Sequence, residues 1–275
     1  MPGGSSEPAA VTATPGGPPV PWSYVTIDRQ GPVAVVRFDR KENLNAFNQQ
    51  LVRELTEAAR TFHDDLDTHY VVLAGAAEAF SAGADLKDTA SWQLAEKTDV
   101  QRRYRFYAGV RLCRAWEDMP QITIAAMERM AVGAGVAIAL ACDWRVLGRG
   151  AFLYVPEVKI GLNLQWGALP RLVTLVGPAR AKRITLMGEK MDAATALAWG
   201  LVDELAEDGR TVEAALAMAR KTAEMPPATV RLMKEAINAT AGALHRATSF
   251  ADGDQSQLTG SFEAARTARE RFGKR

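Results

Sequence analysis

The stretches FSAGADLK (80–87) and AVGAGVAIALACD (131–143) are the most informative parts of this chain. Each contains a turn built from small residues. Gly83 and Ala84 in the first turn let a ligand approach the main chain closely, and Gly133-Ala134-Gly135 does so in the second. The second turn lies where a helix is expected to begin, and an N–H group there has no partner within the helix. Both turns therefore offer backbone amides to a ligand.

The amides of Ala84 and Ala134 are the candidate donors. If they converge, they can hold one thioester oxygen and stabilise the enolate that forms when the neighbouring carbon loses its proton. The two amides would then form an oxyanion hole. Such chemistry needs neither a metal nor a redox cofactor.

Four separated motifs extend this pattern along the chain. They are DRKENLNAFN (39–48), AFSAGADLK (79–87), GAGVAIALACD (133–143) and Pro156-Glu157 leading into GLNLQWGALPRL (161–172), and LMGEKMDAATALAWGLVDEL (186–205) follows them. From about Tyr24 to the C-terminus, this series resembles the crotonase superfamily of enoyl-CoA hydratases and isomerases. Four motifs in family order carry the resemblance, since any one of them alone is a weak signal.

Strands and helices are expected to alternate. YVTIDRQGPVAVVRFDR reads as two strands joined at Gln30-Gly31, and apolar spacing predicts a helix over 47–62 before a buried strand at 70–75. This pattern predicts an α/β fold with a mixed sheet. Further strands are expected at 121–127, 145–147 and 151–154, and helices at the Gly133 turn, 179–187, 193–199, 211–224, 227–239 and 243–272, the last interrupted near Gly253.

The resemblance divides the chain into three parts. It implies a crotonase-like spiral of ββα units over 23–205 and a C-terminal helical oligomerisation region over 206–275. In the family, the C-terminal helices take part in homotrimers that pair into homohexamers. Residues 1–22 are rich in Pro, Gly, Ser and Ala and are predicted to be a disordered tail, with neither a basic n-region nor an arginine.

Glu157 is the predicted acid/base. Its place after Pro156 matches the glutamate that faces the thioester in the family. Most glutamates lie on protein surfaces, so the family match decides this assignment. A carboxyl group in an apolar pocket has a raised pKa, as a proton shuttle near neutral pH requires.

Ala137 occupies the position where hydratases with two glutamates carry the other carboxylate. Alanine cannot hold or protonate a water molecule. The resemblance therefore leaves several reactions open for a lone Glu157: double-bond isomerisation, hydration, or a hydratase-lyase reaction on an aromatic enoyl-CoA. A non-catalytic acyl-CoA binding protein is the alternative outside enzymes.

Other residues are predicted to bind the substrate through their places in the motifs. Leu86 and Lys87 resemble the segment that contacts the adenine and phosphates of coenzyme A, and Asn45-Ala46 resembles the lining of the pantetheine path. A helix N-cap competes as the role of Asn45. Asn163, Gln165 and Trp166 either line the pocket or pack beside it. The remaining predicted binding residues are Ala82, Gly83, Asp85 and Gly133, of which Asp85 is expected chiefly to hold the turn.

Composition excludes several classes of partner. With 33 basic and 32 acidic residues, the net charge of +1 gives no general attraction to nucleic acid or an anionic membrane. The longest apolar run, 130–142, is shorter than the roughly 20 residues that span a bilayer. Cys113 and Cys142 have no paired spacing, which indicates buried thiols in a reducing compartment. A cytoplasmic enzyme is predicted, with no cofactor except the coenzyme A of its substrate.

Three further motifs are interpreted as structural. GAGVAI (133–138) resembles a dinucleotide fingerprint but lacks its sixth small residue and its βαβ context, so a nicotinamide cofactor is not expected. The segment HDDLDTH (63–69) could suggest metal ligands, but a solvated connection between a helix and a strand is favoured. The basic run 101–105 is interpreted as an exposed helix face, with a contact to a coenzyme A phosphate as the alternative.

Overall fold

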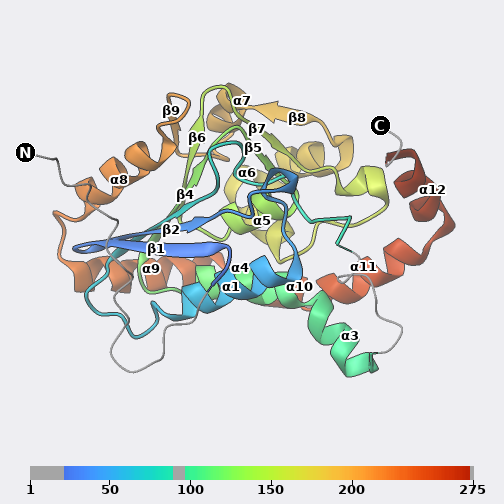
Figure 1. The fold of residues 1–275 in the computed structure, drawn as a ribbon, viewed down its shortest axis with the longest axis horizontal. Helices are drawn as coiled ribbons and strands as arrows, with labels where there is room; N and C mark the ends of the chain where they lie inside the picture. The colour runs from blue at the N-terminus through green and yellow to red at the C-terminus, as the bar shows by residue number, and fades with distance from the viewer. Residues whose placement is uncertain (1–21, 89–96, 273–275) are drawn as a thin grey trace, which may run out of the picture.

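The computed structural model describes residues 22–88 and 97–272. A six-stranded sheet forms the centre, with a three-stranded sheet beside it and helices around both (Figure 1). The α/β class predicted from the alternation of strands and helices is confirmed. The strands are β1 (Val25–Gln30), β2 (Val33–Phe38), β3 (Tyr70–Ala74), β4 (Ile122–Met127), β5 (Met130–Val132), β6 (Trp144–Gly148), β7 (Phe152–Tyr154), β8 (Lys190–Asp192) and β9 (Glu204–Ala206).

Helices follow these strands and fill the C-terminal part of the chain. The α-helices are α1 (Gln49–Arg60), α3 (Asp99–Phe106), α4 (Ala108–Glu117), α5 (Ala134–Ala139), α6 (Ala168–Met187), α7 (Ala193–Ala198), α8 (Thr211–Thr222), α9 (Pro227–Ala241), α10 (His245–Ser249), α11 (Asp252–Ser261) and α12 (Glu263–Phe272). Two short 3-10 helices, η1 (Asn43–Asn45) and η2 (Glu157–Ile160), lie in loops next to the candidate site.

The larger sheet has the strand order β1-β2-β3-β4-β6-β9. Strands β1 and β2 form the predicted antiparallel hairpin, and all other neighbours in this sheet are parallel. The smaller sheet, β5-β7-β8, pairs β5 with β7 in parallel. Because β5 leads into α5 and β7 leads into η2, this pairing brings the ends of two predicted motifs together.

Side chains of the central strands alternate between two cores. On β2, Ala34, Val36 and Phe38 pack in the larger core, whereas Val33 and Val35 pack in the smaller one. This alternation is the period of two that a strand imposes on its side chains. The sheet is therefore covered on both faces, as its parallel strands require.

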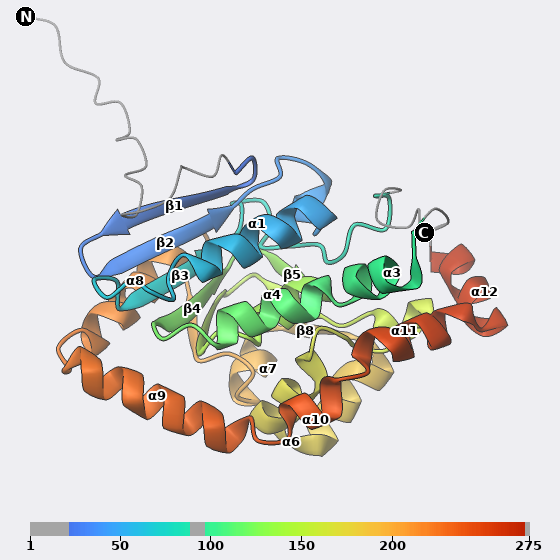
Figure 2. The same ribbon diagram turned by 90° about the horizontal axis from the view of Figure 1, so that it is seen from below.

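Helices α1 and α4 lie side by side against the larger core (Figure 2). Trp116 on α4 is fully buried, and its indole N–H donates to the carbonyl of Leu55 on α1 at 3.2 Å. Helix α8 covers the opposite face of the sheet through Ala215 and Ala219. The six-stranded sheet is therefore packed between helices on its two faces.

Two predicted helices begin at clearly different residues in the structure, and the other helix boundaries agree within two residues. The helix expected over 47–62 begins at Gln49, because the backbone of Phe47 pairs with Ala84 and cannot enter a helix. The helix expected over 179–187 begins at Ala168 and continues across a kink, where Gly177 has a φ of 76° before Pro178. The interruption expected near Gly253 is present between α10 and α11, and a second one lies at Phe262.

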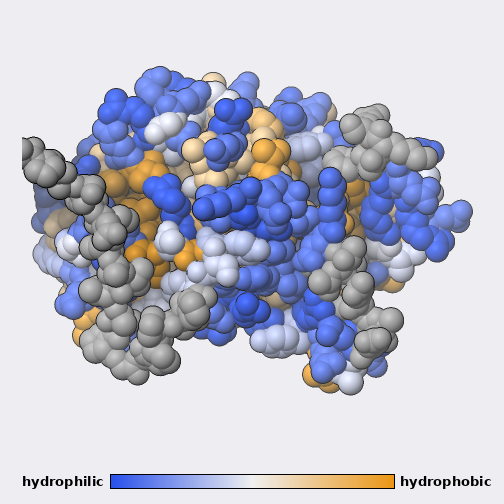
Figure 3. All heavy atoms as spheres, viewed as in Figure 1, coloured by the Kyte–Doolittle hydropathy of each residue, from blue (hydrophilic) through white to orange (hydrophobic). Residues whose placement is uncertain are grey.

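Hydrophilic residues predominate on the face shown in Figure 3, in keeping with the nearly balanced charge. Within the described ranges, none of the helices combines the length and the apolarity needed to cross a bilayer.

Candidate active site

The two small-residue turns lie next to each other. The amide of Ser81 donates to Met130 O at 3.1 Å, and the amide of Val132 donates to Ser81 O at 3.0 Å. These bonds form a parallel bridge between Ser81 and Ala131. The turn after Ser81 and the start of α5 therefore emerge in the same direction, as the first two motifs predict.

Ala84 presents a backbone amide with no acceptor among the described residues. On either side of it, Gly83 O accepts from the Phe47 amide at 2.7 Å, and the Asp85 amide donates to Phe47 O at 2.9 Å. Successive N–H groups in extended backbone point in opposite directions, so the Ala84 N–H points away from Phe47. Gly83 has a φ of 97°, and a Cβ atom there would lie 3.1 Å from Val132 O. The turn thus needs glycine directly before the candidate donor.

Ala134 supplies the second amide. It is the first residue of α5, so its N–H has no partner within the helix, and it donates no hydrogen bond in the described part of the chain. The preceding Gly133 has a φ of 47° and donates its own amide to Tyr154 O at 2.8 Å. This bond joins the start of α5 to the end of β7.

Glu157 follows β7 by three residues and opens η2. A Cβ atom added at Gly133 would lie 2.6 Å from Glu157 Oε1, so the carboxyl group lies directly beside the residue that precedes Ala134. Its other oxygen, Oε2, is buried and has no hydrogen-bond partner among the residues that the structure describes. The structure therefore places a buried carboxyl group, one oxygen of which can still accept a hydrogen bond, next to one candidate oxyanion donor.

Burial raises the pKa of Glu157 from its ordinary value near 4.5 to about 7, although its own backbone N–H opposes this shift. Desolvation disfavours the charged form, and no cation neutralises it. The carboxyl group can therefore both accept and release a proton near neutral pH.

The raised pKa also makes stability depend on pH. Between about pH 4.5 and pH 7 the native carboxyl group keeps a proton that the unfolded chain releases, so the free energy of unfolding falls as the pH rises through this window. Glu157→Gln cannot ionise, so it removes this loss in the free energy of unfolding, which is at most about 3 kcal/mol. We expect thermal melts to show a higher Tm for the variant at about pH 8 and equal Tm values below pH 4.5. The same pH-dependent difference in Glu78→Gln, at an exposed glutamate, would contradict this explanation.

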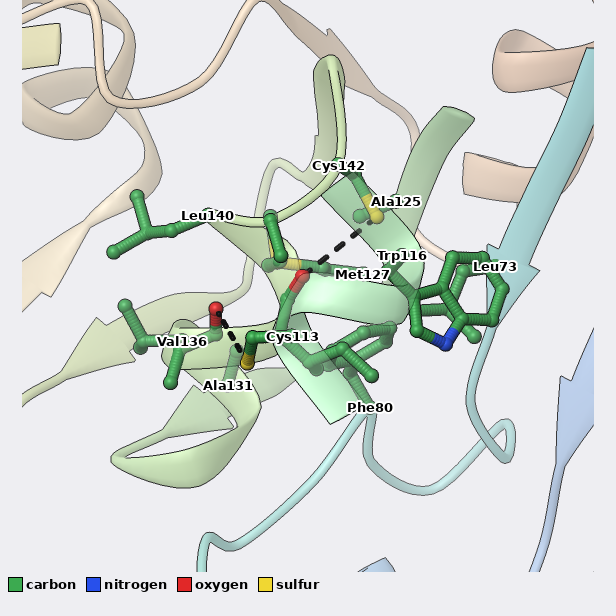
Figure 4. Packing of buried hydrophobic residues seen from close by; sticks show 14 of the residues in the cluster. Leu73, Phe80, Cys113, Trp116, Ala125, Met127, Ala131, Val136, Leu140 and Cys142 are labelled. Atoms are coloured by element: carbon green, nitrogen blue, oxygen red, sulfur yellow. Dashed lines mark hydrogen bonds between the residues drawn. The ribbon is translucent and has the colours of Figure 1, made fainter. Parts of the chain in front are cut away.

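Ala137 lies one turn further along α5 and is buried. Its carbonyl accepts from the Cys113 thiol at 3.6 Å, and the Cys142 thiol donates to the carbonyl of Ile138 at 3.7 Å (Figure 4). Burial raises the pKa of both thiols to about 12, so they pack as neutral groups. Both cysteines are free, as predicted. The α5 sequence contains no acidic residue, so Glu157 has no carboxylate partner on this helix.

Asp85 is a buried structural residue. Burial opposes its ionisation, but the hydrogen bond from Arg40 at 2.8 Å, the charge of Arg40, and the hydrogen bonds from the Lys87 amide and Asn43 together outweigh this effect and lower the pKa of Asp85. The Lys87 amide donates to Asp85 Oδ1 at 3.0 Å. Asp85 thus holds the turn, and the Leu86 and Lys87 side chains that follow it are exposed.

Asn45 links three segments through its side chain. Its Nδ2 donates to Phe38 O and Phe80 O, and its Oδ1 accepts from the Arg40 amide. The alternative that Asn45 caps a helix is wrong, because the side chain of Asn48 caps α1. The polar atoms of the Asn45 side chain are therefore engaged within the protein.

The other members of the predicted binding set lie in these same turns. Ala46 is buried and its carbonyl accepts from Arg40 at 2.6 Å, while half-buried Ala82 donates its amide to Leu44 O. Gly83 and Gly133 are the residues directly before the two free amides. The structure thus brings the predicted residues to one region, with Leu86 and Lys87 at its exposed side.

The C-terminal helices also contact this region, which the sequence did not indicate. Gln165 Nε2 donates to Ser256 Oγ on α11 at 2.6 Å. A Cβ atom at Gly161, just after η2, would lie 2.4 Å from Ala265 on α12. Asn163 lies between Gly161 and Gln165 in the sequence. Its Oδ1 atom is buried and has no hydrogen-bond partner in the described part of the chain. Helices expected only to support oligomers thus pack on the loop that carries Glu157, and the small residues at the contact are the only local signal of it.

The motifs interpreted as structural have protein partners. Asp65, in the segment considered for metal binding, pairs with Arg29 and accepts from Thr68. In the basic run, Arg103 pairs with Asp254 of α11 at 3.2 Å. Helix α3 buries none of its residues, in agreement with an exposed face.

Comparison with known proteins matches residues 28–272 to the family model described as enoyl-CoA hydratase/isomerase. A probable enoyl-CoA hydratase of Mycobacterium tuberculosis is 31% identical over 220 residues, which cover 79% of this chain and 82% of the relative. A short-chain-enoyl-CoA hydratase of Clostridium acetobutylicum is 32% identical over 215 residues, with 78% and 80% covered.

Solved structures share the fold. An enoyl-CoA hydratase from Mycobacterium avium subsp. paratuberculosis superimposes with a TM-score of 0.81 at 24% identity, over 92% of this chain and 97% of that one. DspI of Pseudomonas aeruginosa superimposes with a TM-score of 0.72 at 29% identity, over 92% and 88% of the two chains. The predicted crotonase-like fold is therefore confirmed.

Proposed function

Because the chain belongs to the enoyl-CoA hydratase/isomerase family, we propose that it moves a proton on an acyl-CoA thioester, with Glu157 as its acid/base. The observation that carries this proposal is the carboxyl group of Glu157, which is buried, has an unpartnered oxygen and lies beside Gly133. A buried carboxyl oxygen with no hydrogen-bond partner is costly to keep unless a ligand completes its contacts.

In the proposed mechanism, the thioester oxygen accepts hydrogen bonds from the amides of Ala84 and Ala134. These donors stabilise the negative charge that develops on this oxygen as the enolate forms. Glu157, with a pKa of about 7, takes up or releases the proton at the carbon next to the thioester.

Hydration of an enoyl-CoA is the first candidate reaction, because the relatives from Mycobacterium tuberculosis and Clostridium acetobutylicum are named as enoyl-CoA hydratases. Water would add its hydroxyl to the β carbon, and Glu157 would pass the remaining proton from that water to the α carbon. The product is then a 3-hydroxyacyl-CoA, and Glu157 returns to its starting state.

Isomerisation is the second candidate, and Ala137 favours it. With no carboxylate on α5 to hold a water molecule, Glu157 would take a proton from one carbon of the acyl chain and return it to another. The double bond shifts and nothing is added. This reaction uses the same oxyanion donors and a single carboxyl group.

The experiment that tests the proposal follows solvent deuterium into enoyl-CoA and saturated acyl-CoA thioesters incubated with the wild-type protein. Chromatography of the products separates hydrated from isomerised species. Deuterium at the α carbon with a 3-hydroxy product supports hydration, and a shifted double bond without added water supports isomerisation. Tight acyl-CoA binding without any exchange would overturn the catalytic proposal and leave a binding protein.

The proposed chemistry calls on no group other than coenzyme A, which enters as part of the substrate. Backbone amides stabilise the charge and a carboxyl group moves the proton, so neither electron transfer nor a Lewis acid is needed. We propose the cytoplasm as the site of this reaction.

We further propose that the chain assembles as a homotrimer or homohexamer. Helix α9 buries only Lys234, while Leu232, Met233 and Ile237 are each at least 60% exposed. Such a contiguous apolar face is typical of a subunit interface. Sedimentation equilibrium is expected to give three or six times the mass of one chain, and Ile237→Glu is expected to reduce it. A monomeric wild-type protein, or equal dissociation by Leu66→Glu in an exposed loop, would contradict this assignment.

A further inference from the structure

Trp166 adopts a backbone conformation that large residues rarely take. Its φ is 65°, in the left-handed region, and Gly167 follows with a φ of 68°. A side chain other than glycine in this region costs on the order of 1–3 kcal/mol and persists only where the surroundings impose it. The surrounding structure therefore imposes this conformation on Trp166.

The backbone around Trp166 is fixed by three polar contacts. Arg171 Nη1 donates to Trp166 O at 3.0 Å, and the Gly167 amide donates to Asp252 Oδ2 at 2.8 Å. The neighbouring Gln165 donates to Ser256 Oγ. The partners belong to α6 and α11, so two separate elements fix the backbone from which the indole projects.

The indole ring is wedged between α4 and Phe47. A Cβ atom at Gly109 of α4 would lie 1.9 Å from Trp166 Cε2, so the ring occupies the space that any larger residue would need. The other contact is edge-on to the Phe47 ring, with centroids 5.6 Å apart and planes at 87°. The ring is thus held by packing as well as by its backbone.

This position relates the ring to both halves of the candidate site. The backbone of Phe47 pairs directly with Ala84, one of the two oxyanion donors. Trp166 itself belongs to the segment that follows Glu157. At the start of this segment, the Leu162 amide donates to Glu157 O at 2.9 Å. The Trp166–Phe47 pair therefore connects the donor side to the acid/base side. The contact thus joins the segment that carries Ala84 to the segment that carries Glu157, and Trp166 is the large side chain at this junction.

We propose that Trp166 is a specificity-determining residue that closes the acyl end of the site and restricts the substrate to short acyl chains. This inference rests on the proposed acyl-CoA function. Trp166 acts by filling volume, and Gly109 is its structural complement, because only glycine leaves room for the ring. The substrate class is then an acyl-CoA with a small acyl group.

The test measures the binding of saturated thioesters, which requires no turnover. Isothermal titration gives the Kd of butanoyl-CoA and of dodecanoyl-CoA for wild type, Trp166→Ala and Trp166→Phe. Trp144→Ala is the matched control, since this indole lies on β6 against the smaller core, away from the site. Thermal melts of each variant report whether it folds, and Trp166→Phe supplies the comparison if Trp166→Ala does not.

Wild type is expected to bind butanoyl-CoA at least as tightly as dodecanoyl-CoA. Trp166→Ala is expected to shift the ratio of the two Kd values toward the long chain by about tenfold or more, and Trp166→Phe by less. A wild-type affinity that rises about fourfold with each added methylene would overturn the inference. So would a ratio unchanged by Trp166→Ala, or shifted equally by Trp144→Ala.

The two proposals fail separately in this design. If the wild type binds acyl-CoA with the expected ratio but exchanges no proton, the catalytic function is overturned and the specificity role of Trp166 stands. If exchange occurs without length selectivity, the role of Trp166 is overturned alone. Absence of acyl-CoA binding would overturn both.

Discussion

Replacing Glu157 with Gln is expected to slow deuterium exchange into an acyl-CoA by about 10²- to 10⁴-fold, the usual contribution of a positioned acid/base group. Glutamine keeps the shape of the side chain but cannot accept and release the proton. The wild-type rate of proton abstraction should rise with pH and level off above about pH 7, because the ionised carboxylate is the base and burial raises its pKa to about 7. The variant should lack this pH dependence.

Binding measurements separate this effect from loss of structure. The Kd of a saturated acyl-CoA is expected to change little in Glu157→Gln, because the neutral amide replaces a carboxyl group that has no ion-pair partner. An exchange rate close to that of the wild type would show that another group moves the proton. In that case Glu157 would be a structural residue beside Gly133 and not the acid/base.

Gly133→Ala is expected to lower kcat by about 10²- to 10³-fold, the usual effect of losing one oxyanion donor. The added methyl group would lie 2.6 Å from Glu157 Oε1, so either the carboxyl group or the start of α5 must move. The φ of 47° at Gly133 adds strain for any other residue. Movement of α5 displaces the Ala134 amide, and movement of Glu157 displaces the acid/base. Steady-state kinetics on an enoyl-CoA measures the result.

Gly31→Ala is the matched control for strain. Gly31 has a φ of 59° in the β1–β2 turn, and a Cβ atom there would meet nothing within 4 Å. We expect this variant to lose stability by about 1 kcal/mol, as a left-handed alanine does, while its kcat stays unchanged. If Gly133→Ala kept its kcat, or if Gly31→Ala lost as much activity, the steric explanation would fail.

Local features of this chain were predictable because they depend on neighbours in sequence. Alternating apolar residues predicted the β1–β2 hairpin, and the helix expected over 193–199 is present as α7. Errors arose where a distant segment intervened. Phe47 fits the helical spacing of α1, but its pairing with Ala84 keeps it out of that helix. The left-handed backbone of Trp166 has no signal in the sequence either.

The candidate site divides in the same way. The residue types in the motifs were sufficient to propose Glu157 as the acid/base and the two small-residue turns as the donors, and to show that position 137 carries no carboxylate. These are chemical identities, which the chain carries whatever its conformation.

Long-range folding supplies the rest of the site. The bond from Gly133 N to Tyr154 O joins two motifs and puts the carboxyl group of Glu157 beside the start of α5. The pKa of about 7 follows from desolvation by residues far away in the chain. The packing of α11 and α12 on the active-site loop is another such contact. Solvation and close packing depend on residues that are distant in the sequence but close in the folded structure, so a local pattern of residues cannot predict them.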